Sequence, residues 1–152
     1  MNPGEVVVYK CKGMFKVEDV GTLNFSFVDR RKRYYTLQSL EDSRERAYVP
    51  TEDKENIRKP VSRDEAIELI QKLDEIDVRW IQNEKLRERE YKDCISGNRP
   101  KDWVKVLKTL HKRTISRGSI TSIDKKYQQL IEHALYSELG YALGIPQNKV
   151  EH

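Results

Sequence analysis

The stretch Ile57-Arg-Lys-Pro-Val-Ser-Arg-Asp-Glu65 divides the chain into two halves of different character. Ser62 and Glu65 have the spacing of a capping box, in which a hydroxyl and a carboxylate bond reciprocally to the first backbone amides of a helix. Val61 precedes this cap at the position of a hydrophobic staple. The sequence therefore predicts a helix from about Arg63, joined by little more than residues 56–60 to a separate unit before it.

The residues before this boundary contain short runs rich in β-branched and aromatic side chains. The runs are Glu5–Tyr9, Met14–Val20, Asn24–Val28, Lys32–Ser39 and Arg44–Val49. Turn formers such as Lys12-Gly13 and Gly21 separate them. Five short strands with tight turns predict a small, strongly bent sheet or a partly open barrel. Such a sheet keeps a free edge, on which a strand of a partner can dock.

The residues after the boundary have apolar side chains at the three- and four-residue spacing of helices. Helices are expected from about Arg63, from near Trp80 to Ile95, from Pro100 to before Gly118, and from Thr121 to the closing Gly140, Gly144 and Pro146. Gly97 suits a left-handed cap at the end of the second helix. We therefore predict an α+β fold: a β module at residues 1–59, an all-α domain of four to five helices at residues 60–145, and a polar tail at residues 146–152.

The positive charge of the chain is concentrated in one block. The whole chain has a formal net charge of +4, whereas residues 101–126 carry eight basic and two acidic side chains, a net +6. Neutralisation of nucleic acid phosphates requires such a surplus, although a solvated helix face is the commoner cause of a charge run. The block alone leaves both explanations open.

The sequence shows no constellation of residues for catalysis. It has no glycine-rich phosphate loop, no Gly-x-Ser-x-Gly and no His-Glu-x-x-His. Cys11 and Cys94 lie far apart without a partner at metal-ligand spacing, and the three histidines are scattered. We expect a protein that is not an enzyme, with no catalytic residues, metal, cofactor or small-molecule substrate. No run is long enough to span a membrane and no signal region begins the chain, so we expect a cytoplasmic protein with no membrane partner.

Trp80 is surrounded in the sequence by basic residues and has few apolar neighbours. An indole in this setting either enters the core from the edge of a helix or projects outward to a partner. Because the apolar stripes of the helices supply a core without it, we favour outward projection. Basic side chains near it or near helix ends are the candidates for phosphate contacts: Arg79, Lys85, Arg87, Lys112, Arg113 and Lys125.

Several segments together resemble the CarD/CdnL family of bacterial transcription regulators. The β half carries Gly4-Glu-Val-Val-Val-Tyr9, Lys12-Gly13, Lys32-Arg-Tyr-Tyr-Thr-Leu37, Tyr48-Val-Pro50 and Ile57-Arg-Lys-Pro-Val61. The helical half has a Trp followed by a basic helix, a Ser-Gly-Asn stop and the stretch from His111 to Lys125. The likeness covers nearly residues 3–145, although Lys10-Cys-Lys12 departs from the Pro-His-His common in the family.

The resemblance implies a Tudor-like β module that binds the β subunit of RNA polymerase. It also implies a helical domain that contacts promoter DNA, through the minor groove and the phosphates, at the upstream edge of the bubble and stabilises the open complex. Trp80 matches the tryptophan that wedges into the minor groove, and Lys85, Arg113 and Lys125 match basic positions assigned to the DNA backbone. The polymerase-facing candidates are Phe25, Phe27, Arg46 and Tyr48. Such a regulator would be cytoplasmic and associated with the nucleoid.

A second interpretation belongs to a different class of protein. The chain would then be an interaction adaptor, whose β module captures a peptide or a sheet edge and whose helices bind no DNA. DNA binding at low salt separates the two interpretations, because only the regulator is expected to show it.

Overall fold

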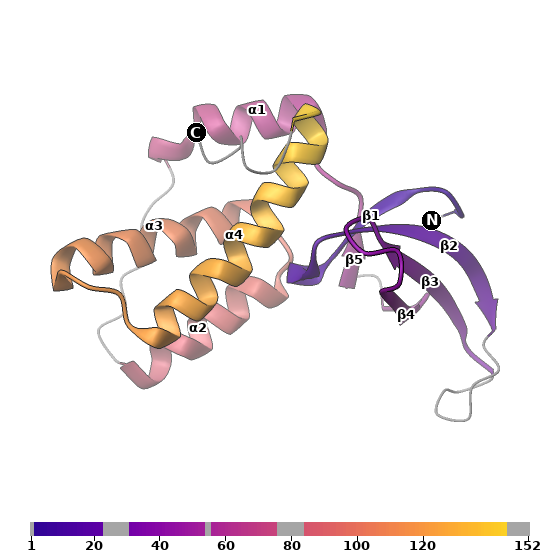
Figure 1. Cartoon of the computed structure of the whole chain (residues 1–152), viewed down its shortest axis with the longest axis horizontal. Coiled ribbons are helices and arrows are strands. Elements are labelled where there is room, and N and C mark those ends of the chain that lie inside the picture. The colour runs from indigo at the N-terminus through magenta and orange to yellow at the C-terminus, as the bar shows by residue number, and fades with distance from the viewer. Residues whose placement is uncertain (1, 23–30, 54–55, 76–83, 146–152) are drawn as a thin grey trace.

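The computed structural model describes residues 2–22, 31–53, 56–75 and 84–145 (Figure 1). Within these ranges, the N-terminal half forms one antiparallel sheet of five strands in the order β4-β3-β2-β1-β5. The strands are β1 (Val6–Tyr9), β2 (Met14–Thr22), β3 (Arg33–Ser39), β4 (Arg46–Pro50) and β5 (Ile57–Arg58), with a short 3-10 helix η1 (Lys10–Lys12) between β1 and β2. The described strands form an open sheet rather than a closed barrel.

The C-terminal half is helical, which confirms the predicted α+β class. Its helices are α1 (Arg63–Gln71), α2 (Glu84–Ser96), α3 (Pro100–Arg117) and α4 (Ser122–Leu143), with a 3-10 turn η3 (Leu73–Glu75) after α1. The helices gather on one side of the molecule and the sheet extends from the other (Figure 1). α4, the longest of the described helices, contacts α1, α2 and α3 and also η1 and β2 of the β module.

The fifth strand lies where the sequence had suggested only a linker. The predicted strand Asn24–Val28 falls outside the described residues. β5 instead pairs with β1, with Arg58 opposite Val8 and Ile57 opposite Tyr9. A two-residue strand is too short to show the alternation that identifies strands, so its pairing with β1 is what defines it. Ile57 is buried in the core of the sheet.

The helix ends largely follow the predicted caps. Ser62 and Glu65 form the reciprocal bonds of the capping box at α1, with distances of 3.1 and 3.0 Å. α3 begins at Pro100 and is followed by a left-handed glycine, Gly118. Thr121 caps α4, since its Oγ1 accepts a bond of 3.1 Å from the backbone N–H of Asp124.

α2 ends at Ser96 and α4 is capped by Gly144, as predicted, but Gly97 and Gly140 do not have the roles expected of them. The left-handed residue after α2 is Asn98, with a φ of 53°, rather than Gly97. Asparagine tolerates this conformation better than most side chains do. Gly140 does not close α4, which continues to Leu143 and ends at the left-handed Gly144. Gly140 is buried inside the helix, where a small residue allows close packing.

Each half of the chain has its own hydrophobic core, and the two cores adjoin at β1. Val7 faces the core of the sheet, while its neighbour Val8 faces the core of the helices. This split follows from the alternation of side chains along a strand. Met14 at the start of β2 joins Val8 in the helical core, in which Trp103 is fully buried. The sheet is therefore attached to the helices through apolar contacts as well as through the chain.

Candidate functional site

An arginine and a tyrosine stand side by side on the outer face of the sheet. Arg46 and Tyr48 are two residues apart on β4, so their side chains leave the strand on the same side. Both are exposed, and Tyr48 has 37% of its surface accessible. These are the two described members of the predicted polymerase-facing set, because Phe25 and Phe27 lie outside the described residues. The structure thus brings Arg46 and Tyr48 together.

The Arg46 guanidinium is held across the sheet by a carboxylate. Its Nε and Nη2 donate to Oε2 and Oε1 of Glu18 on β2, at 3.0 and 3.3 Å. The pair crosses over β3, because β4 and β2 are not neighbours. A two-point contact between a guanidinium and a carboxylate fixes orientation as well as distance. A partner carboxylate would therefore find the guanidinium already oriented, but would compete with Glu18 for it.

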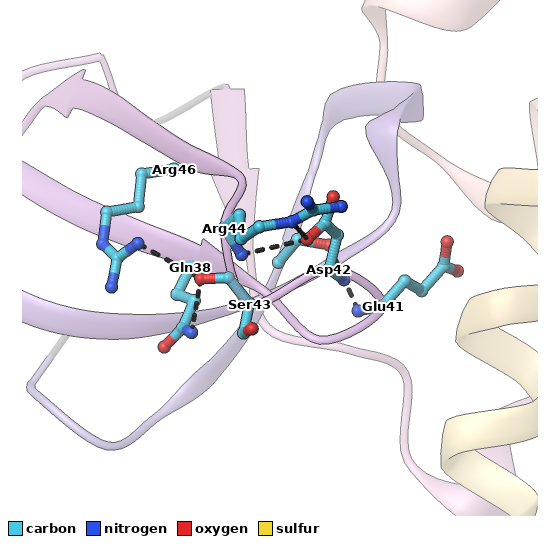
Figure 2. A network of polar contacts seen from close by, with 7 residues as sticks. Gln38, Glu41, Asp42, Ser43, Arg44 and Arg46 are labelled. Atoms are coloured by element: carbon cyan, nitrogen blue, oxygen red, sulfur yellow. Dashed lines mark hydrogen bonds and ion pairs between the residues drawn. The ribbon is translucent and has the colours of Figure 1, made fainter.

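The turn between β3 and β4 supports this arrangement (Figure 2). The carbonyl of Ser43 accepts bonds from Gln38 Nε2 at 2.9 Å and from Arg46 Nη1 at 3.1 Å. Asp42 accepts bonds from the backbone N–H and the Nε of Arg44, at 3.0 and 3.3 Å. The turn is thus tied to both strands that it connects, and Arg46 is anchored at two points.

β4 is also the last strand on its side of the described sheet. The backbone of Ser39 donates to Glu45, and that of Thr51 donates to Arg33. In an antiparallel pair, alternate residues bond to the neighbouring strand. The backbone groups of Arg46 and Tyr48 consequently point away from β3. This geometry is suited to the addition of a strand from another protein.

The positive block at residues 101–126 remains largely on the surface. Five of its eight basic residues are exposed: Lys101, Lys112, Arg117, Lys125 and Lys126. Lys112 and Lys125, both predicted to contact phosphates, lie in the last two turns of α3 and the first turn of α4, on either side of the turn that joins these helices. Lys108 instead donates to the backbone carbonyl of Leu73, at 2.7 Å. Of the exposed basic residues, Lys112, Arg117, Lys125 and Lys126 lie near this turn, whereas Lys101 lies at the other end of α3.

Two of the predicted DNA-binding residues lie inside the protein. Arg87 on α2 and Arg113 on α3 are only 3% and 5% exposed. Their Nε atoms lie 3.3 and 3.1 Å from the two carboxylate oxygens of Asp124 on α4, which is itself 1% exposed. A guanidinium enclosed in this way is not positioned to reach a phosphate. We therefore correct both assignments: these arginines join three helices.

A signal for this burial exists in the helical spacing. Val106, Leu110 and Arg113 are separated by four and three residues, so Arg113 falls on the apolar stripe of α3. On α2, Arg87 stands one turn before the buried Tyr91, whereas its neighbour Leu86 is exposed. Buried arginines require a buried partner. Asp124, an acidic residue in the first turn of α4, is one such partner for both arginines.

Two tyrosines complete the buried network. The hydroxyl of Tyr91 donates to Asp124 at 3.3 Å, and that of Tyr127 donates to Glu88 at 3.0 Å. Burial, reinforced by Asp124, raises the pKa of Tyr91 to about 12. Burial and the bond to Glu88 raise the pKa of Tyr127 to about 12 as well. Both hydroxyls therefore stay protonated donors near neutral pH, as a structural role requires.

The remaining predicted DNA contacts fall beyond what the structure describes. Arg79 and Trp80 lie outside the described residues, and Lys85 is described in its backbone only.

A groove of about 640 Å³ lies between α1, α3 and α4 and is lined mainly by apolar side chains such as Leu69 and Leu107. In the described segments, no three potential metal ligands come together and no helix is long and apolar enough to cross a membrane.

The part of the chain that forms the sheet matches a known protein family. Residues 1–61 match the CarD-like/TRCF RID domain family. The matched span includes the five strands of the described sheet and stops just before the capping Ser62. A search of curated proteins finds no significant match to the chain.

Proposed function

We propose that the chain regulates transcription by joining RNA polymerase to promoter DNA, because residues 1–61 match the CarD-like/TRCF RID domain family. The family assignment gives the chain a transcription-related role with RNA polymerase as partner, through a protein-interaction module rather than a catalytic one. The proposal adds the β subunit as the docking site, promoter DNA as the ligand of the helices, and stabilisation of the open complex as the outcome.

The sheet offers two features for docking on the β subunit. The backbone groups of Arg46 and Tyr48 point outward from a terminal strand, where a strand of the polymerase can be added. The Arg46 guanidinium, already oriented by Glu18, can transfer to a carboxylate of the partner. Main-chain bonds would then supply affinity, while the two side chains supply specificity.

The helices offer a cationic surface for DNA. One of the two acids in the positive block, Asp124, is buried between two guanidiniums and so does not reduce the exposed surplus. Lysines that contact phosphates give an affinity that depends on salt and little on sequence. Lys112 and Lys125 are the described residues that we propose for this role. Attachment to polymerase would raise the local concentration of such a weak binder at promoters.

Trp80 remains the proposed wedge. Its match to the tryptophan of the CarD/CdnL family supports insertion into the minor groove, where an apolar side chain responds to deformable or opening DNA. Trp80→Ala is expected to shorten the lifetime of the open complex while polymerase binding survives. Tyr141→Ala removes an exposed aromatic from the far end of α4 and serves as the control. An unchanged lifetime in Trp80→Ala would exclude the wedge.

DNA binding itself is tested by a salt titration of the full chain on a duplex. Replacing Lys112 and Lys125 by alanine should weaken binding and reduce the slope of log K against log salt by about 2, since each phosphate contact contributes about 0.9. Lys72→Ala is the matched control, because Lys72 is an exposed lysine at the C-terminal end of α1 that pairs with Glu68. Absence of DNA binding by the wild-type chain at low salt would favour the adaptor.

A further inference from the structure

A glutamate of α4 is completely buried and is bound by residues from the sheet side of the molecule. Glu138 is 0% exposed. Its Oε2 accepts bonds from Arg58 Nη1 at 2.6 Å and from the backbone N–H of Val61 at 2.8 Å, and its Oε1 accepts a bond from Arg58 Nη2 at 2.5 Å. All three donors belong to β5 or the segment that follows it. One carboxylate on a helix therefore holds the end of the sheet.

Arg58 extends this contact to the rest of the helical half. Its Nε donates to the backbone carbonyl of Asn98 at 2.6 Å, and its guanidinium lies 5.5 Å from the ring centre of the buried Trp103. Asn98 follows α2 and has a left-handed backbone conformation, and it is the carbonyl of this residue that accepts the bond from Arg58. A single side chain from β5 thus contacts α4, the α2–α3 turn and α3.

The β module and the helices also meet elsewhere, since η1 packs against α4 and α2 and β2 packs against α4. Val8 and Met14 enter the helical core. Glu41 points from the β3–β4 turn towards α4 (Figure 2), where it meets His133 Nε2 and Ser137 Oγ, each at 3.2 Å. Two units of one chain move relative to one another unless the contacts between them prevent it. A bidentate guanidinium–carboxylate contact restricts rotation as well as separation, which a few apolar contacts do less well.

We propose that Arg58 and Glu138 are a positioning pair that fixes the orientation of the β module relative to the helices. Breaking a buried pair from one side leaves an uncompensated buried group, so the two units would separate or rotate to let water reach it. The consequence for function rests on the proposed function above. A fixed orientation sets the distance between polymerase on the sheet and DNA on the helices, so both can be bound at once.

The orientation can be measured on the full chain without labels on either surface. Residual dipolar couplings of backbone amides give one alignment tensor for the sheet and one for the helices. The two tensors should coincide in the wild-type protein and diverge in Glu138→Gln, which keeps the shape of the side chain but removes its charge. Arg58→Lys is the second variant, since it keeps a positive charge beside Glu138 but loses the two-point contact.

Glu68→Gln is the matched control, because it makes the same chemical change in an exposed pair with Lys72 on α1. Its two tensors should coincide as in the wild-type protein. Coincident tensors in both Glu138→Gln and Arg58→Lys would overturn the proposal. If Glu138→Gln does not fold, Arg58→Lys alone decides between the two outcomes.

The effect on function is a separate measurement. Loss of simultaneous binding should weaken the attachment of Glu138→Gln to a polymerase–promoter complex by about 10²-fold, whereas binding to polymerase alone stays unchanged. Divergent tensors with unchanged attachment would confirm the positioning pair and overturn its role in spacing the partners. A wild-type protein without effect on the complex would refute the proposed function and leave the tensor result standing.

Discussion

Asp124→Asn should be among the most damaging single substitutions in the helical half. The carboxylate of Asp124 lies between the guanidiniums of Arg87 and Arg113, and all three side chains are almost completely buried. The amide keeps the size of the side chain but removes the negative charge that lies between two buried guanidiniums. Removing one partner of a buried ion pair costs about 3–5 kcal/mol. We expect a loss of about 3 kcal/mol, because the remaining oxygen of Asn can still accept a bond.

Equilibrium unfolding of the full chain in urea measures this loss. With a denaturant dependence of about 2 kcal/mol per molar urea, the midpoint should fall by about 1.5 M. Asp102→Asn is the control, because Asp102 also occupies the first turn of its helix but is only half-buried. Its loss should be limited to the helix-dipole contribution of about 0.5 kcal/mol. Equal losses in the two variants would refute the claim that Asp124 neutralises buried arginines.

Three further perturbations test other parts of the structure. Burial raises the pKa of Tyr91 and of Tyr127 to about 12, above the usual value of 10 that holds in the unfolded chain. The folded state therefore binds these two protons more tightly than the unfolded state does. The stability that this contributes is fully present below pH 10 and is lost as the pH rises towards 12. A midpoint of urea unfolding that stays constant between pH 10 and 12 would contradict the burial of these hydroxyls. Gly118→Ala should lower the free energy of unfolding by about 1 kcal/mol in the same assay, because the φ of 80° at Gly118 is strained for alanine. Gly21→Ala is the control, since the space around both glycines is open but Gly21 has no positive φ, and it should show no such loss. Arg46→Ala should reduce the affinity for polymerase in a titration with little change in stability, since exposed ion pairs contribute about 0–1 kcal/mol; an unchanged affinity would remove Arg46 from the docking surface.

Local sequence signals predicted the helical half well. The capping box at Ser62, Pro100 at the start of α3, Gly118 after it and Thr121 before α4 all depend on contacts within a few residues, and each was found as expected. The strand β5 could not be predicted, because it exists through pairing with β1, some 50 residues earlier in the chain. The same limit applies to Asn98, whose left-handed turn meets Arg58 from the sheet.

The candidate site was predicted less completely. Basic residues were taken as surface residues by their charge, which is correct for Lys112 and Lys125 but wrong for Arg87 and Arg113. Charge indicates what a side chain binds, whereas helical spacing indicates which way it faces. The Arg58–Glu138 pair was missed for a related reason. Its members are 80 residues apart, and no local pattern connects them.

The half-life of the open promoter complex tests the proposed role most directly. It should be measured with RNA polymerase on one promoter, with and without a saturating amount of the protein. We expect a longer half-life with the wild-type protein, and a return towards the value for polymerase alone when Lys112 and Lys125 are both replaced by alanine. A half-life that does not change on addition of the wild-type protein, under conditions where the protein is bound to polymerase, would contradict stabilisation of the open complex.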